Sequence, residues 1–382
     1  MSPTTEQGFG DTLIQLQRLG VVMEPEPGNP MEEEGVLNPA AARGRDGQLY
    51  LFPRLVGSGN FSRICIARVR FDEAGEPVGV ERLGIALEPQ AEYELRPDGG
   101  GCEDPRITFM EPLQRYVMTY TAFSSRGPRI ALAMSEDLFH WDRLGLASFE
   151  PYEGVDFNDV ANKDALLFPV AIPDPDGRLS MALIHRPLFP GTGPDEKLHC
   201  RFPREVDILR ESIWISYHSL VHEVCTEHHH LCHFDSHRRL ACPVAAWEQL
   251  KIGGGTPPIL TPLGWLFLYH GVREAANKLS GHELSYSAGL LILDEKHPHL
   301  IRYRSPEPVL APDLPTEREG VVPNVVFPTA LDRRDDLGLP GRFDVYYGMA
   351  DNRIGVARLD LPANLPTEAM PQVPAKPFRA AP

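Results

Sequence analysis

Short apolar runs bounded by turn-forming residues recur along most of the chain. The runs are rich in β-branched and aromatic residues, and the residues around them are mainly Gly, Pro, Asp and Asn. Runs of this length and composition between turn signals are typical of β-strands. The predicted strands are "QLYLF", "SRICIARV", "RYVMTYTAF", "PRIALAMS", "LSMALIH", "SIWISY", "GWLFLYHG", "FDVYYGMA" and "RIGVARLDL". We therefore predict an all-β chain whose strands are joined by tight turns.

A helix is predicted only near the N-terminus. Leu13, Leu16 and Leu19 recur at roughly helical spacing in "DTLIQLQRLG", and the next residue is a glycine. Residues 1–30 are accordingly expected to form a short N-terminal extension with helical character. The Pro-rich residues 363–382 are expected to form a C-terminal tail.

The predicted strands group into a coarse repeat of five units, each roughly 60 to 90 residues long. Each unit opens with a polar or Pro-containing loop and a strand, and an apolar hairpin follows. The openings are "LNPAAA", "CEDPRITF", "NKDALLFP", "GGTPPILT" and "VPNVVFPTAL". Five units of about four strands describe a five-bladed β-propeller, here over residues 31–362. A β-sandwich or a pair of barrels is the alternative, in which the same loops are ordinary turns.

Composition and charge limit the partners that we expect. The 382 residues, 42% of them hydrophobic, are enough to bury a large core. A formal net charge of −16 would repel a polyanion, so we expect neither a nucleic acid nor a membrane as partner. The N-terminus lacks a basic segment followed by an apolar one, which favours a cytoplasmic protein. The six cysteines contain no CxxC pair and are interpreted as reduced thiols, and homo-oligomer formation is left open.

In a propeller the innermost strand of each blade borders the central axis, so the five opening loops would meet at one end of that axis. Their polar residues would then share one pocket that mixes carboxylates with cations. The set comprises Asn38, Asn60, Arg63, Glu103, Asp104, Arg106, Arg126, Arg129, Lys163, Asp164, His270, Asn324 and Asp351.

The composition of this pocket favours phosphate over water as the nucleophile for cleavage of a glycoside. Inverting hydrolysis needs a carboxylate base in addition to the general acid. Phosphate is already anionic at neutral pH, so the protein must instead supply guanidinium, ammonium and imidazole donors to hold it. These donors are Arg63, Arg126 or Arg129, Lys163 and His270.

Seven motifs, in this order, resemble glycoside hydrolase family 130, the β-mannoside phosphorylases. They are "NFSRICIA", "CEDPRI", "YTAF…RIALAMS", "NKDALLFP", "KIGGGTPPI", "GWLFLYHG" and "YYGMADNRIGVA", and the similarity runs from about residue 30 to residue 360. The resemblance implies a five-bladed propeller that converts a β-mannoside and inorganic phosphate, with inversion, to α-mannose 1-phosphate and a shortened sugar. Phosphate would be the co-substrate, and no cofactor or metal is implied.

The resemblance also implies roles for individual residues. Asp104 would be the general acid, which protonates the glycosidic oxygen through the mannosyl 3-hydroxyl. The phosphate ligands would be Arg63, Arg126 or Arg129, Lys163 and His270. The substrate-binding residues would be Asn60, Asp164 and Asp351, together with Glu103 and Arg106 as supports of the acid. Pro105 limits the flexibility of the loop that aims Asp104 into the pocket.

Residues 217–243 depart from the family pattern, in which a shorter stretch is expected to join the third and fourth blades. They contain His218, His222, His228, His229, His230, His233 and His237 beside Cys225, Cys232 and Cys242. Imidazoles and thiolates at this density can bind Zn²⁺, but their spacing matches no standard zinc template. We therefore expect no metal and interpret the segment as a rim insertion that shapes the acceptor subsite or a subunit contact.

Two other functions are open at this point. A β-mannosidase of the same fold would need a carboxylate base where the phosphate ligands stand. A non-catalytic sugar-binding propeller would have no use for a phosphate-sized cluster of cations. A single sequence does not decide between β-1,4 and β-1,2 linkages, or between glucose, N-acetylglucosamine and mannose as the acceptor.

Overall fold

The computed structural model of the protein describes residues 14–151, 156–188, 211–219, 231–275, 283–367 and 369. Its regular structure is almost entirely β, and every one of the predicted strands is confirmed. The helical segments of this part of the chain are single turns, namely η1 (Glu92–Glu94), η3 (Ala246–Glu248), η4 (Asp335–Leu337) and the helix α1 (Pro315–Arg318).

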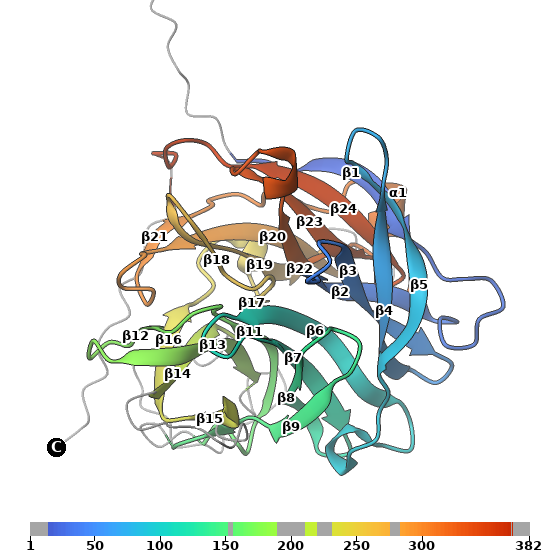
Figure 1. Cartoon of the computed structure of the whole chain (residues 1–382), viewed down its shortest axis with the longest axis horizontal. Helices are drawn as coiled ribbons and strands as arrows, with labels where there is room; N and C mark the ends of the chain where they lie inside the picture. The colour runs from blue at the N-terminus through green and yellow to red at the C-terminus, as the bar shows by residue number, and fades with distance from the viewer. Residues whose placement is uncertain are drawn as a thin grey trace, which may run out of the picture.

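The strands form five units of four main strands (Figure 1). The first unit contains β2 (Gly35–Arg43), β3 (Leu49–Gly57), β4 (Phe61–Phe71) and β5 (Pro77–Leu87). The second contains β6 (Gly100–Met110), β7 (Arg115–Ser124), β8 (Gly127–Ser135) and β9 (Asp142–Leu146). A short parallel pairing of β4 with β6, over Phe61–Gly100 and Ser62–Gly101, joins these two units into one sheet of eight strands.

The other three units are separate sheets. The third contains β11 (Ala161–Leu167), β13 (Leu179–Leu188), β14 (Ile213–Ser219) and β16 (Ser236–Ala241), with β12 (Ile172–Pro173) beside β13. The fourth contains β17 (Lys251–Gly254), β19 (Gly264–Glu274), β20 (Leu284–Leu293) and β21 (Ile301–Arg304), with β18 (Ile259–Thr261) beside β19. The fifth contains β22 (Val326–Arg333), β23 (Arg342–Met349), β24 (Arg353–Asp360) and β1 (Gln17–Met23), and a small separate pair is formed by β10 (Ser148–Phe149) and β15 (His233–Phe234).

The predicted N-terminal helix is wrong where the structure describes that segment, because residues 17–23 form β1. This strand pairs with β24 in antiparallel register, from Gln17 opposite Arg358 to Met23 opposite Ile354. Leu16, one of the leucines that suggested a helical stripe, is 7% exposed in a core cluster shared with β20 and β23, and Leu19 is partly buried against the cluster between the last and first units. The first thirteen residues lie outside the described part, and the boundary expected at residue 30 falls after a strand of the fifth unit.

The hydrophobic core is divided into five clusters, and each cluster lies between two consecutive units. The fifth cluster joins the last unit to the first, since Tyr346 and Ile354 pack there with Val36, Leu51 and other residues of the first unit. In Figure 1 the strands β2, β6, β11, β17 and β22 gather toward the middle of the molecule, while β5, β9, β16 and β21 lie farther out. The opening loops therefore lie on the strands nearest the centre.

A buried glutamate recurs at the same place in three units. One carboxylate oxygen of each glutamate accepts hydrogen bonds from a tyrosine hydroxyl and an arginine, and the other accepts from two backbone N–H groups just before the glutamate. The three sets are Glu94 with Tyr120 and Arg143, Glu248 with Tyr269 and Arg304, and Glu317 with Tyr347 and Arg18. Because Arg18 lies on β1, the N-terminal strand takes the outer position that β9 and β21 take in their units.

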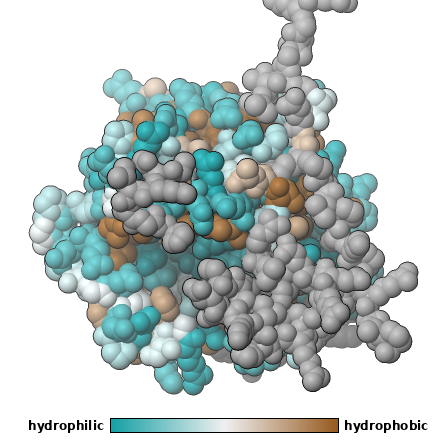
Figure 2. Space-filling view, turned by 180° about the vertical axis from the view of Figure 1, so that it is seen from behind, coloured by the Kyte–Doolittle hydropathy of each residue, from teal (hydrophilic) through white to brown (hydrophobic). Residues whose placement is uncertain are grey.

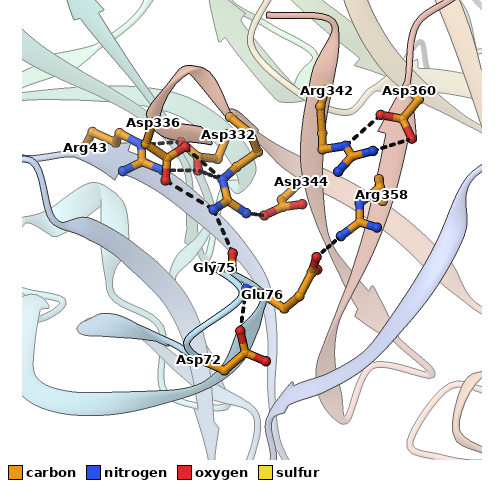
Figure 3. A network of polar contacts seen from close by, with 11 residues as sticks. Arg43, Asp72, Gly75, Glu76, Asp332, Asp336, Arg342, Asp344, Arg358 and Asp360 are labelled. Atoms are coloured by element: carbon orange, nitrogen blue, oxygen red, sulfur yellow. Dashed lines mark hydrogen bonds and ion pairs between the residues drawn. The ribbon is translucent and has the colours of Figure 1, made fainter. Parts of the chain in front are cut away.

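Charged residues also hold the hairpin between β4 and β5 against the fifth unit (Figure 3). Arg334, 1% exposed, donates to Asp344, to Asp336 and to the carbonyl of Gly75 at 2.7 Å. Burial raises the pKa of Asp344 to about 6, although the Arg334 guanidinium beside it favours the ionised carboxylate. The seam between the first and last units therefore depends on buried charges as well as on apolar packing.

On the face seen from behind, most of the described residues at the surface are hydrophilic, and apolar residues form small separate groups (Figure 2). None of the helices in the described ranges is long and apolar enough to cross a membrane.

Candidate active site

Asp104 lies at a bulge in β6, the first strand of the second unit. The antiparallel register of β6 with β7 shifts between Glu103 and Arg106, and Asp104 has the left-handed φ of 46°. Its Oδ1 accepts from Asn38 Nδ2 at 2.9 Å and from Arg54 Nη1 at 3.3 Å, while Lys163 Nζ is 3.8 Å from Oδ2. A carboxylate from the second unit is thus held by residues of the first and third units.

The bulge of β6 belongs to a pattern in the central strands. Asn38 in β2 and Asp164 in β11 also have positive φ, 45° and 58°, and each lies in a register shift like that of Asp104. A non-glycine residue in this conformation costs roughly 1 kcal/mol or more, and such residues cluster at functional sites. Asn324 and Asp351, at 60° and 50°, add two polar residues of the same kind from the fifth unit.

Burial and charged neighbours together set the pKa values of three carboxyl groups in this region. Burial raises the pKa of Asp104, but Arg54 and Lys163 outweigh burial and the net pKa lies below its usual value. Glu103, 4% exposed, accepts from Arg54 Nη2 at 2.8 Å, yet burial together with the charge of Asp104 raises its pKa. Burial also raises the pKa of Asp351 to about 6.

A second group of charges surrounds Asp164. Arg186 Nε donates to Asp164 Oδ2 at 2.6 Å, and His270 Nε2 lies 3.6 Å from the same oxygen. Burial would raise the pKa of Asp164, but Arg186 and His270 outweigh it and hold the pKa well below its usual range. Gly253 makes this approach feasible, because a Cβ there would lie 2.4 Å from Asp164 Oδ2 and 2.5 Å from His270 Cε1.

His270 is a neutral donor rather than a cation. It is 0% exposed, and burial lowers the pKa of its imidazole to about 3 against the opposing effect of Asp164. Neither ring nitrogen has a hydrogen-bond partner among the described residues. An N–H group without a partner in a buried position is ready to donate to a bound ligand.

Lys251 is a cation that the sequence argument did not single out, although it opens the "KIGGG" motif. Burial, together with the nearby charges of Arg186 and Lys163, lowers the pKa of its ammonium group to about 7. Its Nζ lies 5.8 Å from the centre of the Tyr286 ring, and Tyr286 in turn lies beside His270. Lys163 and Lys251 therefore belong to one electrostatic group around Asp164.

Arg54 and Arg186 were also missed, and the sequence does contain a signal for both. Each stands within an apolar strand, in "LFPRLV" and "LIHRPL". An arginine in a buried strand must be paired with a carboxylate, since an unpaired buried charge is very costly.

Two other predicted site residues, Arg106 and Asn60, differ in their burial. Arg106, 1% exposed, donates to the carbonyls of Asp104, Pro105 and Gly255, so it supports the loops. Asn60 is exposed in the turn before β4, where its N–H donates to Glu34.

Of three further predicted phosphate ligands, the side chains of two have partners other than the Asp104 and Asp164 carboxylates, and the third is exposed. Arg63 forms an ion pair with Glu88 at 3.0 Å. Arg126 is exposed, and Arg129 is half-buried with Nη1 donating to the carbonyl of Pro128 at 3.0 Å. Burial lowers the pKa of Arg129, and Arg126 nearby lowers it further.

The described part of residues 217–243 is largely ordinary sheet. It supplies the outer strand β16 and the short strand β15, and Cys232 and Cys242 are free thiols. No group of three or more His, Cys, Asp or Glu side chains that could hold a metal occurs among the described residues. His222, Cys225, His228, His229 and His230 lie outside them.

The chain is similar to known proteins over most of its length. The family model described as β-1,4-mannooligosaccharide phosphorylase, glycoside hydrolase family 130, matches residues 16–364. The 1,2-β-oligomannan phosphorylase of Thermoanaerobacter sp. (strain X514) is 31% identical over 358 residues, which cover 91% of this chain and 98% of that protein. The β-1,4-mannooligosaccharide phosphorylase of Ruminococcus albus is 42% identical over 125 residues, 33% of this chain and 35% of that protein.

Solved structures share the fold. The β-1,2-mannobiose phosphorylase of Listeria innocua, solved with β-1,2-mannobiose, superposes with a TM-score of 0.65 at 22% identity, over 90% of this chain and 96% of that one. A glycosyl hydrolase from Bacteroides ovatus gives a TM-score of 0.67 at 20% identity, over 94% and 98% of the two chains.

Proposed function

The chain belongs to glycoside hydrolase family 130, and from that premise we propose that it is an inverting phosphorylase of β-mannosides. It converts a β-mannoside and inorganic phosphate to α-mannose 1-phosphate and a shortened sugar. Phosphate is a co-substrate, and the reaction needs no metal or organic cofactor.

The observation that carries this proposal is the group of nitrogen donors around Asp164. Lys163, Lys251 and Arg186 are close enough that the two other cations lower the pKa of Lys251. Like charges at this distance repel one another, and the carboxylates of Asp164 and Glu211, which pair with Arg186, offset the repulsion only in part because the pKa of Lys251 is still lowered. A phosphate dianion would relieve this repulsion, accept from the free N–H of His270 and be held for attack on the sugar.

Asp104 supplies the proton. Its pKa is low without a ligand because Arg54 and Lys163 favour the carboxylate. A bound phosphate would neutralise part of this positive charge and a bound sugar would exclude water, and both effects raise the pKa of Asp104 toward that of a general acid at neutral pH. By the resemblance to the family, the proton then passes to the leaving oxygen through the mannosyl 3-hydroxyl. The protonated phosphate ester formed by the attack returns a proton to Asp104.

The sugar and the remaining phosphate contacts complete the proposal. Asn60, Asp164 and Asp351 bind the mannosyl ring, and Glu103 fixes Arg54 against Asp104. Arg63 would join the phosphate site only by exchanging its partner Glu88 for the ligand. Of the two arginines in the β7–β8 hairpin, Arg129 is the better candidate, because it is half-buried whereas Arg126 is exposed.

We also propose that the five units form a five-bladed β-propeller with this site on its axis. Two features support it: a core cluster lies between each pair of consecutive units including the last and the first, and the Glu–Tyr–Arg set repeats in three units. We propose no nucleic-acid or anionic-membrane partner, because the net charge of −16 would repel a polyanion.

A β-mannosidase is the second candidate, and one observation favours it. Asp351 has a pKa raised to about 6, which would suit a general base if it faced the opposite side of the sugar from Asp104. Incubation with β-1,2- and β-1,4-mannobiose, with and without phosphate, separates the two. Phosphorolysis predicts α-mannose 1-phosphate by ³¹P NMR and little free mannose without phosphate. Fast release of mannose at a rate independent of phosphate would support the mannosidase instead. The disaccharide that is cleaved faster identifies the linkage.

A further inference from the structure

A line of hydrogen-bonded side chains crosses the third sheet from its central strand β11 to its outer strand β16. His185 Nδ1 on β13 lies 3.1 Å from the side-chain amide of Asn162 on β11, and His185 Nε2 lies 2.7 Å from Ser216 Oγ on β14. His237 Nδ1 on β16 lies 2.8 Å from the same Ser216 Oγ, and its Nε2 lies 2.9 Å from the carbonyl oxygen of Glu150. All four side chains are at most 4% exposed.

Both imidazoles are neutral. Phe149 stacks on His185 with ring centres 5.0 Å apart, and Phe157 lies 5.0 Å from His237. This burial holds the pKa of His185 well below its usual value, and a proton on His237 would lower it further. Burial lowers the pKa of His237 to about 4.

Counting donors and acceptors then fixes the direction of every bond. A neutral imidazole has one N–H and one acceptor nitrogen. The carbonyl of Glu150 can only accept, so His237 carries its proton on Nε2 and accepts on Nδ1 from the Ser216 hydroxyl. Ser216 Oγ must in turn accept from His185 Nε2–H, which leaves His185 Nδ1 as an acceptor.

The last link requires the amide of Asn162 to donate. The structure places Oδ1 beside His185 Nδ1 and leaves Nδ2 without a hydrogen-bond partner among the described residues. Two acceptors facing each other would repel. A half-turn of the amide exchanges two atoms of nearly equal size and gives a donor to His185 without moving the strand.

We propose that Asn162, His185, Ser216 and His237 form a one-way hydrogen-bond relay that positions β11, and with it Lys163, from the outer edge of the sheet. Asn162 directly precedes Lys163, and alternate residues of a strand point to opposite faces, so the relay holds one side of the strand while Lys163 faces Asp104 on the other. The next residue, Asp164, has the strained φ of 58°, and strain of this kind persists only where neighbours hold it. His237 lies on β16, so an outer strand of the third unit supplies one end of the relay.

The relay itself is tested without any assay of activity. The intact protein labelled with ¹⁵N-histidine should show His185 and His237 as Nε2–H tautomers that do not titrate between pH 6 and pH 8, with the two signals assigned from His185→Asn and His237→Asn. In Asn162→Asp at pH 8 the ionised carboxylate can only accept, so the proton of His185 should move to Nδ1. An Nδ1–H tautomer in the wild-type protein, or no change in Asn162→Asp, overturns the relay.

The positioning role rests on the proposed function and is tested separately by kinetics. Ser216→Ala removes both central bonds, and we expect the KM for phosphate to rise on the order of ten-fold with a smaller change in kcat. Ser180→Ala is the matched control, because Ser180 is equally buried in the same sheet and outside the relay. Equal phosphate KM values in the two folded variants overturn positioning even if the tautomers are as expected. If the activity of the wild-type protein does not depend on phosphate, the proposed function is wrong. The histidine tautomers seen by NMR still show whether the relay exists.

Discussion

Replacing Lys163 by methionine would test two consequences of its position at once. Its ammonium group lies 3.8 Å from the carboxylate of Asp104, and the side chain is 24% exposed. Methionine keeps much of the apolar stem and removes the charge. The phosphate site would lose a donor, and Asp104 would lose a neighbouring cation.

The two losses affect different quantities: one weakens phosphate binding, and the other raises the pKa of Asp104. A hydrogen bond to a charged group contributes roughly 1.5 to 3 kcal/mol, so the KM for phosphate should rise by about 10- to 100-fold. Opposite unit charges about 4 Å apart attract by at most about 4 kcal/mol at an effective dielectric constant near 20, and solvent at the ammonium group reduces this value. Loss of that attraction favours the protonated carboxyl, so the pKa of Asp104 should rise and the alkaline limb of kcat should move to higher pH.

The assay is phosphorolysis of a mannobiose at several phosphate concentrations between pH 5 and pH 9, with mannose 1-phosphate as the readout. Lys163→Arg is the control, because it keeps the charge and should leave the alkaline limb in place. The reasoning is refuted if Lys163→Met changes the phosphate KM by less than two-fold, or if its alkaline limb moves to lower pH.

Four further predictions concern the acid, the second lysine, the seam of the fold and the His/Cys-rich segment. Asp104→Asn should keep the melting temperature and lower kcat by about 10² to 10⁴, and near-native turnover would remove Asp104 from the role of acid. Lys251 has a pKa of about 7, so its charge is lost as pH rises through 7; the phosphate KM of the wild type should rise with pH more steeply than that of Lys251→Arg, and parallel curves would contradict this. Arg334→Met should cost at most about 3 to 5 kcal/mol of unfolding free energy, because Asp344 loses its cation and must be buried either unpaired or protonated. Arg342→Met, in an exposed pair with Asp360, should cost at most about 1 kcal/mol in the same denaturant titration. Untagged protein should contain well under one zinc per chain by elemental analysis, and stoichiometric zinc with chelator-sensitive activity would show a metal site in residues 217–243.

The strands could be predicted from the sequence because their signal is local. Runs such as "GWLFLYHG" combine apolar residues with flanking turns, and the strand β19 follows directly. The N-terminal segment failed for a physical reason that no local window contains. Its leucines have helical spacing, but β1 gains an antiparallel partner in β24, more than 300 residues later in the chain, and tertiary pairing outweighs propensity.

The constrained backbone of the site could be predicted, but the pairing of its side chains could not. "CEDPRI" is expected to be a constrained loop before a strand, but Asp104 lies within β6, where a bulge gives it a positive φ. Nothing in the sequence, however, shows that Arg63 faces Glu88, or that Lys251 is buried beside Lys163. Those contacts depend on how neighbouring sheets are rotated against each other, and the charge state of His270 depends on burial that only the folded chain reveals.

The pairing of β1 with β24 also bears on how the protein is made. A ribosome releases residues 17–23 long before residues 353–360, so the fifth sheet stays incomplete until β24 has been synthesised. The first four units can pack in order as they emerge, but the edge of β24 has no partner until the two ends of the chain meet, and closing so long a loop is slow. A rearranged gene that encodes residues 14–30 after residue 367 would place all four strands of that sheet side by side in the chain, and the last step of folding would become a local one.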